Sequence, residues 1–205
     1  MEKQEELAEL LWSMEYTKRA YRKMIAQTDE LVKTQFIEMF GDPQDNPKGW
    51  HVCTLNDVMK ASASNGFFAK PKDYCEDGNA GIICVGDVVN RKYSNISSLR
   101  RANASEKEFA KYHVEYGDML FCRSSLVKEG IAKASIVPKT EATDLLFECH
   151  VIRLPLDLRK CVPEFMQVLS TMDYFRNQVI AQSKTATMTT IGQDGILKTD
   201  IILPP

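Results

Sequence analysis

The chain is divided at residues 36–50, which read FIEMFGDPQDNPKGW. Gly41-Asp42-Pro43 and then Asn46-Pro47-Lys48-Gly49 concentrate the residues that end helices most reliably. Proline lacks an amide proton, and glycine tolerates backbone conformations that other residues avoid. We therefore predict a helix at residues 1–41 and a separate domain at residues 42–205.

The N-terminal side of this boundary has the pattern of one long helix. Residues 5–40 contain neither proline nor glycine, and apolar or semi-apolar residues recur at alternating steps of four and three, which is typical of a coiled-coil seam. At about 1.5 Å per residue the helix would be roughly 50 Å long. Lys18 and Thr28 interrupt the seam, so we expect packing against a partner helix rather than an ideal zipper. The seam residues expected to pair are Leu7, Leu11, Met14, Tyr21, Ile25, Val32 and Phe36.

The C-terminal side has short β-like runs separated by turn residues. The expected strands are residues 52–55, 82–85, 119–122, 131–137, 147–154 and 196–203. Residues 131–137 alternate as a half-buried strand would, and Pro163 to Ala181 is typical of one amphipathic helix. The predicted fold is therefore α+β, with a long N-terminal coiled-coil-like helix followed by one mixed, mostly antiparallel α/β domain.

Composition is that of a folded soluble protein. The chain has 205 residues, 44% of them hydrophobic and 26% charged, enough to form a core without disulfides or metal. The six cysteines include no Cys-x-x-Cys pair, so we expect reduced thiols, mostly buried in strands, and no zinc site. The first ten residues do not resemble a secretory signal, and no apolar stretch could cross a bilayer. We therefore expect a cytoplasmic protein.

The formal net charge of −2 argues against general affinity for nucleic acid, because that affinity comes from lysine and arginine neutralising phosphates. The placement of charge matters more than its sum. Acidic residues gather in the first helix, whereas several cations fall close together beyond it: Arg91, Lys92, Arg100, Arg101, Lys107 and Lys111. A locally basic face on a nearly neutral protein is therefore expected.

The boundary stretch resembles the junction between a spacer helix and a recognition domain in the specificity subunits of type I restriction-modification systems. The resemblance rests on residues 36–43 and 46–50, followed by Leu55 and Val58. Three further motifs follow in the family's order: ICVGDV at 83–88, GDMLFCR at 117–123 with Gly130 after it, and residues 185–195 leading into ILPP at 202–205. The chain resembles half of such a subunit, with one target-recognition domain.

The resemblance implies a subunit that reads DNA without cutting or methylating it. In that family two recognition domains read the two halves of a bipartite sequence, and paired helices fix the gap between the halves. The implied partners are double-stranded DNA, a methyltransferase subunit and a restriction subunit. S-adenosylmethionine, ATP and Mg would belong to those subunits, so no cofactor is expected here. We expect two copies to pair through antiparallel helices and to prefer a symmetric bipartite site.

A catalytic role is not supported by the motifs. The chain lacks a metal-dependent nuclease end-motif, an Asn/Asp-Pro-Pro-aromatic methyltransferase motif, a phosphate loop and a Gly-x-Ser-x-Gly elbow. His51, His113 and His150 have no companion arrangement and are expected to be structural or solvent-facing. We expect a non-enzymatic protein, with an unrecognised hydrolase as a remote alternative.

Three polar clusters carry the residue types that contact phosphates and base edges. The first, around Asn65, Lys70 and Lys72, is interleaved with Phe67 and Phe68, which are expected to pack in the core or a loop. The residues expected to contact DNA come from the other two clusters: Asn90, Arg91, Lys92, Arg100, Arg101, Arg123, Ser124, Lys128, Lys184 and Thr185. Solvated surface is the alternative for each. Gly86-Asp87 and Gly117-Asp118 are expected to form turns, with the aspartate as cap.

Two functions remain open from the sequence. The first is a sequence-specific DNA-recognition subunit that docks the methyltransferase and restriction subunits. The second is an interaction or decoy half-subunit that binds a methyltransferase or another specificity subunit through its helix without reading DNA. The weak net charge favours the second slightly.

Overall fold

The structure of this protein is a computed structural model that describes residues 2–205, apart from the side chains of Glu2 and Pro71. The chain forms two compact units. The first ends at Lys48, and the second is Gly49–Pro205. Among the described residues, none of the helices combines the length and apolar character needed to cross a membrane.

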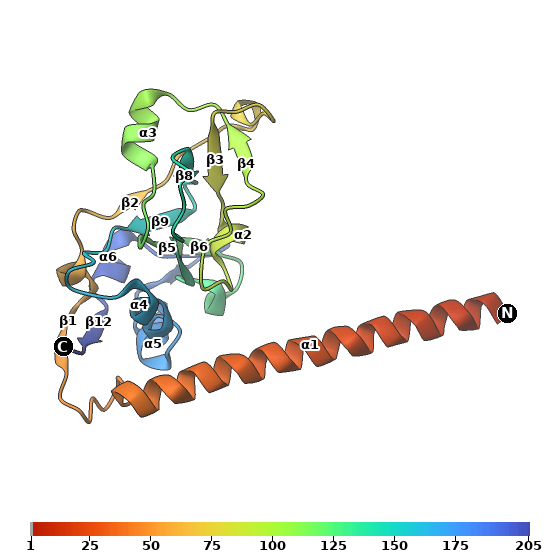
Figure 1. The fold of residues 1–205 in the computed structure, drawn as a ribbon, viewed down its shortest axis with the longest axis horizontal. Helices are drawn as coiled ribbons and strands as arrows, with labels where there is room; N and C mark the ends of the chain where they lie inside the picture. Colours follow the sequence, from red (N-terminus) through yellow and green to blue (C-terminus); the bar gives the residue numbers. More distant parts are fainter. Residues whose placement is uncertain (1) are drawn as a thin grey trace. The chain divides into compact units, whose positions relative to one another are not determined.

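The first unit is a single helix, α1 (Glu2–Phe40), which confirms the long helix expected from the sequence (Figure 1). Its surface carries ion pairs at helical spacing, including Glu15–Lys18 and Glu15–Arg19, each of which stabilises a helix by only about 0.2–0.5 kcal/mol. The apolar seam is solvent-exposed: Leu11 is 65% and Tyr21 59% exposed. Phe36 differs because it is buried, and its ring lies 5.0 Å from that of Phe40.

Glycine ends α1 for a steric reason. Gly41 has φ +83°, and its amide donates to the Ile37 carbonyl at 2.8 Å, which closes the last turn. A Cβ at this position would lie 2.7 Å from Pro47 Cγ. Lys48 Nζ then donates to the Met39 carbonyl at 2.5 Å. The Gly-Asp-Pro break therefore acts through backbone conformation and through close packing of the turn.

The second unit contains four small sheets. In the largest, of order β2-β9-β5-β7, every pair is antiparallel, and its strands are β2 (Ser64–Asn65), β9 (Val151–Leu154), β5 (Met119–Cys122) and β7 (Ala134–Ile136). A second sheet joins β3 (Ala80–Ile83) to β4 (Arg100–Ala102) antiparallel and to β8 (Leu145–Phe147) parallel. The expectation of a mixed, mostly antiparallel domain is confirmed.

Two further sheets complete the unit. The first and last strands of the domain, β1 (His51–Thr54) and β12 (Asp200–Leu203), pair antiparallel. A three-stranded sheet of order β10-β11-β6 joins β10 (Lys184–Thr185), β11 (Thr189–Thr190) and β6 (Ser124–Ser125). The short helices between strands are η1 (Leu55–Val58), η2 (Pro71–Asp73), α2 (Val85–Val88), α3 (Glu106–Tyr112), η3 (Lys128–Gly130), α4 (Pro163–Leu169), α5 (Asp173–Gln182) and α6 (Gln193–Leu197).

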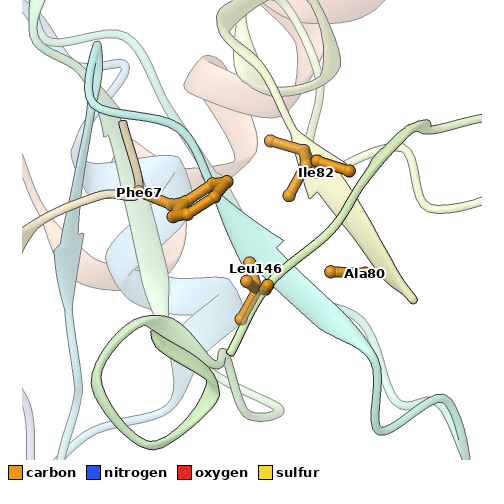
Figure 2. Packing of buried hydrophobic residues seen from close by; sticks show 6 residues of the cluster. Phe67, Ala80, Ile82 and Leu146 are labelled. Atoms are coloured by element: carbon orange, nitrogen blue, oxygen red, sulfur yellow. The ribbon is translucent and has the colours of Figure 1, made fainter. Parts of the chain in front are cut away.

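Two of the buried clusters in the core of the domain are linked by one aromatic side chain. Phe67, Ala80, Ile82 and Leu146 belong to the first cluster (Figure 2). Ile83, Val88, Leu120, Val137, Phe147 and Val151 form the second. The ring of Tyr112 lies 6.1 Å from that of Phe67 and 6.4 Å from that of Phe147. Phe67 is core as expected, but the same expectation was wrong for Phe68, which is 68% exposed.

The single helix expected at 163–181 is two helices. The α4 helix ends at Leu169 and α5 begins at Asp173. In the break, Ser170 Oγ donates to the Gln167 carbonyl at 2.6 Å and Thr171 Oγ1 to the Val168 carbonyl at 2.7 Å. Hydroxyl side chains that bind backbone carbonyls compete with helix continuation. The apolar pattern continues across residues 170–172 although the helix does not, so the pattern alone did not predict the break.

Three expected strands are shorter than predicted. Residues 131–137 contain only β7, because Ala132 has φ +51°, and both faces of β7 are buried rather than one. Residues 147–154 split where the Val151 amide donates to the Glu148 carbonyl in a turn. Residues 196–203 begin in α6, so only Asp200–Leu203 is strand. Buried runs look alike in sequence whether they are strand or tight turn.

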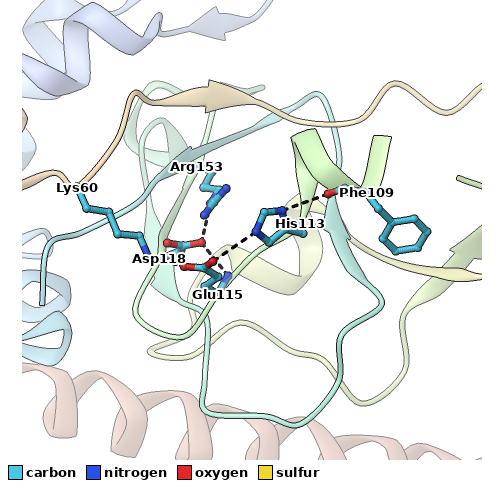
Figure 3. A network of polar contacts seen from close by, with 6 residues as sticks. All are labelled: Lys60, Phe109, His113, Glu115, Asp118 and Arg153. Atoms are coloured by element: carbon cyan, nitrogen blue, oxygen red, sulfur yellow. Dashed lines mark hydrogen bonds and ion pairs between the residues drawn. The ribbon is translucent and has the colours of Figure 1, made fainter. Parts of the chain in front are cut away.

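A buried ion pair lies where β5 begins (Figure 3). Asp118 Oδ2 accepts from Arg153 Nε at 2.5 Å and from the Glu115 amide at 2.8 Å, and Asp118 Oδ1 is buried without a hydrogen-bond partner. Burial raises the pKa of Asp118, although Arg153 opposes the shift. Glu115 pairs with Lys60 and lies 3.4 Å from His113 Nε2. Asp118 caps the turn after Gly117, as expected, and also ties β5 to β9.

Candidate nucleic-acid interface

The three-stranded sheet β10-β11-β6 gathers polar side chains from distant parts of the sequence. All its residues except Lys184 carry a hydroxyl group, so we call it the hydroxyl sheet: Ser124, Ser125, Lys184, Thr185, Thr189 and Thr190. Ser124 pairs with Thr190, which in turn pairs with Lys184. Three of the sequence-predicted residues, Ser124, Lys184 and Thr185, therefore lie in one small sheet.

A hydrogen bond between two threonine side chains links β10 to β11 in the hydroxyl sheet. Thr189 is buried, and its Oγ1 lies 2.9 Å from Thr185 Oγ1. Lys184, Thr185 and Thr190 are exposed, and Ser124 is half-buried. Hydroxyl groups both donate and accept hydrogen bonds, so the exposed members can bind either phosphate oxygens or base edges.

Arg123 enters the hydroxyl sheet from the main sheet. Its amide donates to the His150 carbonyl at 2.8 Å, and its carbonyl accepts from the Ile191 amide at 3.0 Å. Its Nη1 donates to the Cys149 carbonyl at 3.2 Å, which orients the half-buried guanidinium. His150 Nδ1 lies 2.9 Å from Ser124 Oγ. Arg123, Ser124 and His150 therefore form one connected polar group beside β11.

The residues at 90–92 lie on an exposed loop after α2. Asn90 has φ +58°, and its Oδ1 accepts from Lys133 Nζ at 2.6 Å. Arg91 and Lys92 are exposed. The Lys133 carbonyl accepts from the Cys122 amide at 2.9 Å, one residue before Arg123. Lys133 therefore links this loop to the strand that leads into the hydroxyl sheet. Gly86-Asp87 belongs to α2, where Asp87 Oδ2 caps the Cys84 amide at 3.0 Å.

Arg100 and Arg101 on β4 have contacts of a different kind. Arg101 Nε donates to the Gly78 carbonyl at 2.7 Å, and its Nη2 pairs with Asp144 at 2.7 Å. The Arg100 guanidinium lies 3.8 Å above the centre of the Tyr74 ring. Both arginines thus bind groups of the domain itself, Arg101 through its charge and Arg100 through a ring face.

The remaining predicted residues are more dispersed. Lys128 is exposed at the start of η3, directly after the loop that follows β6. In the first polar cluster, Asn65 lies in β2 and Lys70 and Lys72 are exposed around η2. His150 and Lys133 contact the candidate residues Ser124 and Asn90 but were not predicted as site residues. Both contacts are long-range, so neither residue has a local sequence signal.

The described residues contain no cluster of three or more histidine, cysteine, aspartate or glutamate side chains that could hold a metal. All six cysteines are free, and Cys53 and Cys122 are the ones that lie in strands. Only Cys122 and Cys161 are buried, so the expectation of thiols mostly buried in strands was wrong. Burial raises the pKa of Cys84 to about 12 and that of Cys161 to about 11. These two thiols are therefore protonated and poor nucleophiles at neutral pH.

One curated relative matches the chain in sequence. The type I restriction enzyme EcoKI specificity subunit of Escherichia coli (strain K12) is 27% identical over 146 residues, which is 69% of this chain and 30% of that protein. No protein-family model matches. The chain therefore spans about a third of the length of its curated relative.

Solved structures agree in fold. A chain from a type I R-M system, solved for its complex assembly and conformational transition, matches with a TM-score of 0.60 at 16% identity, over 91% of this chain and 43% of that one. The HsdS subunit from Thermoanaerobacter tengcongensis matches with a TM-score of 0.53 at 16% identity, over 91% and 42%. The resemblance seen in the sequence is confirmed, and the chain is similar, over one long helix and one α+β domain, to the specificity subunits of type I restriction-modification systems.

Proposed function

We propose that this chain is a non-catalytic DNA-recognition module that reads one half of a bipartite DNA target for a type I restriction-modification system. The observation that carries the proposal is the hydroxyl sheet, which includes Lys184, together with Arg123 and Lys128 next to β6 in sequence. A sheet this small has little apolar surface with which to stabilise the fold, whereas its exposed hydroxyl and cationic groups match those that contact DNA. The similarity to the EcoKI specificity subunit supports the same function.

The side chains divide into two roles by geometry. Lys128 and Lys184 are exposed cations suited to phosphate contacts, which fix the register of the protein on DNA without reading sequence. Arg123 is oriented by the Cys149 carbonyl and has a planar donor group that matches the O6 and N7 acceptors of guanine. Ser124, held by His150, is the second candidate for a base edge.

We further propose that the exposed stripe of α1 pairs with a second long helix, in another copy or another specificity half. A stripe that includes Leu11, Met14 and Ile25 at more than half exposure is costly to leave in water. The same framework would dock the methyltransferase and restriction subunits, which would supply S-adenosylmethionine, ATP and Mg. This chain is proposed to bind no cofactor.

The deciding experiment is selection from a randomised duplex pool at physiological salt by the chain co-purified with a methyltransferase subunit. A two-part, gapped motif in the retained DNA is the expected result, and a palindromic motif would indicate two copies paired through their helices. A stable complex that enriches no sequence would contradict DNA reading.

The second candidate is an interaction or decoy half-subunit. The observation in its favour is that Arg100 and Arg101 bind groups of the domain itself, which leaves fewer cations for phosphate on a chain of net charge −2. This second function would be selected if the chain binds the methyltransferase through α1 but the complex binds DNA no more tightly than the methyltransferase alone.

A further inference from the structure

Two adjacent apolar side chains project into solvent directly after the hydroxyl sheet. Leu126 is 85% exposed, the highest value among the large hydrophobic side chains that the structure describes, and Val127 is 59% exposed. They lie between β6 (Ser124–Ser125) and η3 (Lys128–Gly130). Single exposed apolar residues are ordinary. An adjacent exposed pair forms contiguous apolar surface, which indicates an interaction site.

The loop that carries this pair is braced at its base. The Val127 amide donates to Ser125 Oγ at 3.3 Å, and the Gly130 amide donates to the Val127 carbonyl at 3.0 Å. Gly130 packs so closely that a Cβ there would lie 2.3 Å from Ser125 Oγ. The loop therefore folds back on itself and holds its tip outward.

Arg176 of α5 anchors the return of the loop. Its guanidinium donates to the backbone carbonyls of Glu129, Ile131 and Ala132 at 3.1, 2.5 and 2.9 Å. Three carbonyls on one guanidinium fix the path of the chain after the tip, which reduces the conformational freedom that the loop loses when its tip binds. A preformed apolar tip is suited to insertion.

The surroundings of the tip are mainly cationic. Arg123 and Lys128 flank it in sequence, and Lys184 lies across the hydroxyl sheet, whereas Glu129 is the acidic residue within the loop. A DNA groove has phosphates along its borders and stacked bases at its floor. The cations around the tip can bind the phosphates, and the apolar tip can contact the bases. Leucine is among the side chains that proteins insert between base pairs, where it partly unstacks them and kinks the duplex.

We propose that Leu126 and Val127 form an apolar wedge that inserts between base pairs of the DNA held by the hydroxyl sheet. The proposal rests on the DNA-reading function above. It assigns to this loop the deformation of the duplex, so that the sequence at the wedged step contributes to specificity through its ease of unstacking.

The test uses the full chain in its methyltransferase complex and the duplex retained from the selection, with 2-aminopurine placed at successive positions. Wild type should raise the fluorescence at one step. Leu126→Ser should return that signal to the free-duplex level and raise the Kd about tenfold, the equivalent of 1.4 kcal/mol. Leu126→Met, which keeps an apolar side chain of similar volume, should retain the signal. Val162→Ser is the control, because Val162 is also exposed but lies at the start of α4.

The outcomes separate the two proposals. Retention of a gapped motif without any rise in fluorescence would overturn the wedge and leave DNA reading intact. A tenfold loss of affinity in Leu126→Ser with the wild-type rise in fluorescence retained would also overturn it, because the bases would then be unstacked without the Leu126 side chain. If wild type retains no DNA, the DNA-reading function fails and the wedge fails with it.

Discussion

The helix and the domain use apolar residues in opposite ways. In α1, Leu11 is 65% exposed, whereas in the domain Leu55, Ile82 and Phe121 are fully buried. The ring of Phe121 lies 6.2 Å from that of Phe175, which attaches α5 to the central strand β5. The domain thus has a core of its own, whereas the seam of α1 is exposed in the single chain and would be covered only by the pairing proposed above.

This difference predicts where each kind of substitution acts. Substitutions inside the domain should lower the free energy of unfolding of a single chain. Substitutions in the seam should weaken association between chains and leave the free energy of unfolding of the domain unchanged.

Asp118→Ala should have the largest effect on the domain. The side chain is 1% exposed, and its removal leaves the Arg153 charge, 12% exposed, without its carboxylate. Breaking one side of a buried pair typically costs about 3–5 kcal/mol. Urea unfolding of the single variant, followed by tryptophan fluorescence, would measure the loss.

A double variant, Asp118→Leu with Arg153→Met, sharpens this prediction. Replacing both members removes the buried charges together and the unpartnered Asp118 Oδ1 with them. Such replacements are often neutral or stabilising, so the double variant should unfold at a higher urea concentration than Asp118→Ala. Equal losses in the two variants would show that the pair acts through turn geometry, through the Glu115 amide, rather than through charge.

Substitutions in the helix seam should come next in size. Leu11→Asp with Ile25→Asp places charges at two exposed seam positions, and each buried leucine or isoleucine contributes about 1.5–3 kcal/mol when covered by a partner. Sedimentation at micromolar concentration should show a shift from dimer to monomer. Glu9→Gln with Lys23→Gln is the control off the predicted seam. A monomer in wild type would remove the pairing proposal for this chain alone.

Arg123→Ala should have a smaller effect, confined to DNA. If the guanidinium reads a guanine, its loss should relax specificity at one position by about 1–3 kcal/mol, whereas a phosphate contact would weaken all sequences alike. The matched control is Lys198→Ala, which removes an exposed cation at the end of α6. Competition binding with single-base variants of the selected duplex distinguishes the two roles. If neither the specificity nor the overall affinity changes, Arg123 is excluded from the interface.

The sequence predicted those features of the fold that depend on residues close together in the chain. The absence of proline and glycine before Gly41 predicted α1, and the Gly41 backbone at φ +83° is what ends it. Asp118 as a turn cap was likewise predictable from its place after Gly117. Its pairing with Arg153, 35 residues away, was not, because a long-range contact leaves no trace in local spacing.

The candidate interface shows the same limit. Each strand of the hydroxyl sheet has two residues, too few for any alternation to be seen. The residue types at Ser124, Lys184 and Thr185 suggested DNA contact, but their register with Thr190 comes from folding alone. Arg101 was placed with the DNA-contacting cations, and its partner Asp144 lies 43 residues away. Residue type predicts which side chains can contact DNA. The fold determines whether such a side chain binds a group of the domain instead, as Arg101 binds Asp144.

The smallest effect should be a pH dependence within the domain. Asp157 accepts from Arg159 Nε at 2.9 Å and Nη2 at 2.8 Å, and these hydrogen bonds lower the pKa of Asp157 to about 2. Because the folded-state pKa lies below the ordinary value of 3.8, the contribution to stability is present above pH 3.8 and is lost as the pH falls towards 2. Asp157→Asn should therefore unfold more readily than wild type at pH 6, and the difference should shrink as the pH falls through 2. A difference of unchanged size would show that the effect does not come from the charge of Asp157, because an asparagine Oδ1 can still accept from the Arg159 amide.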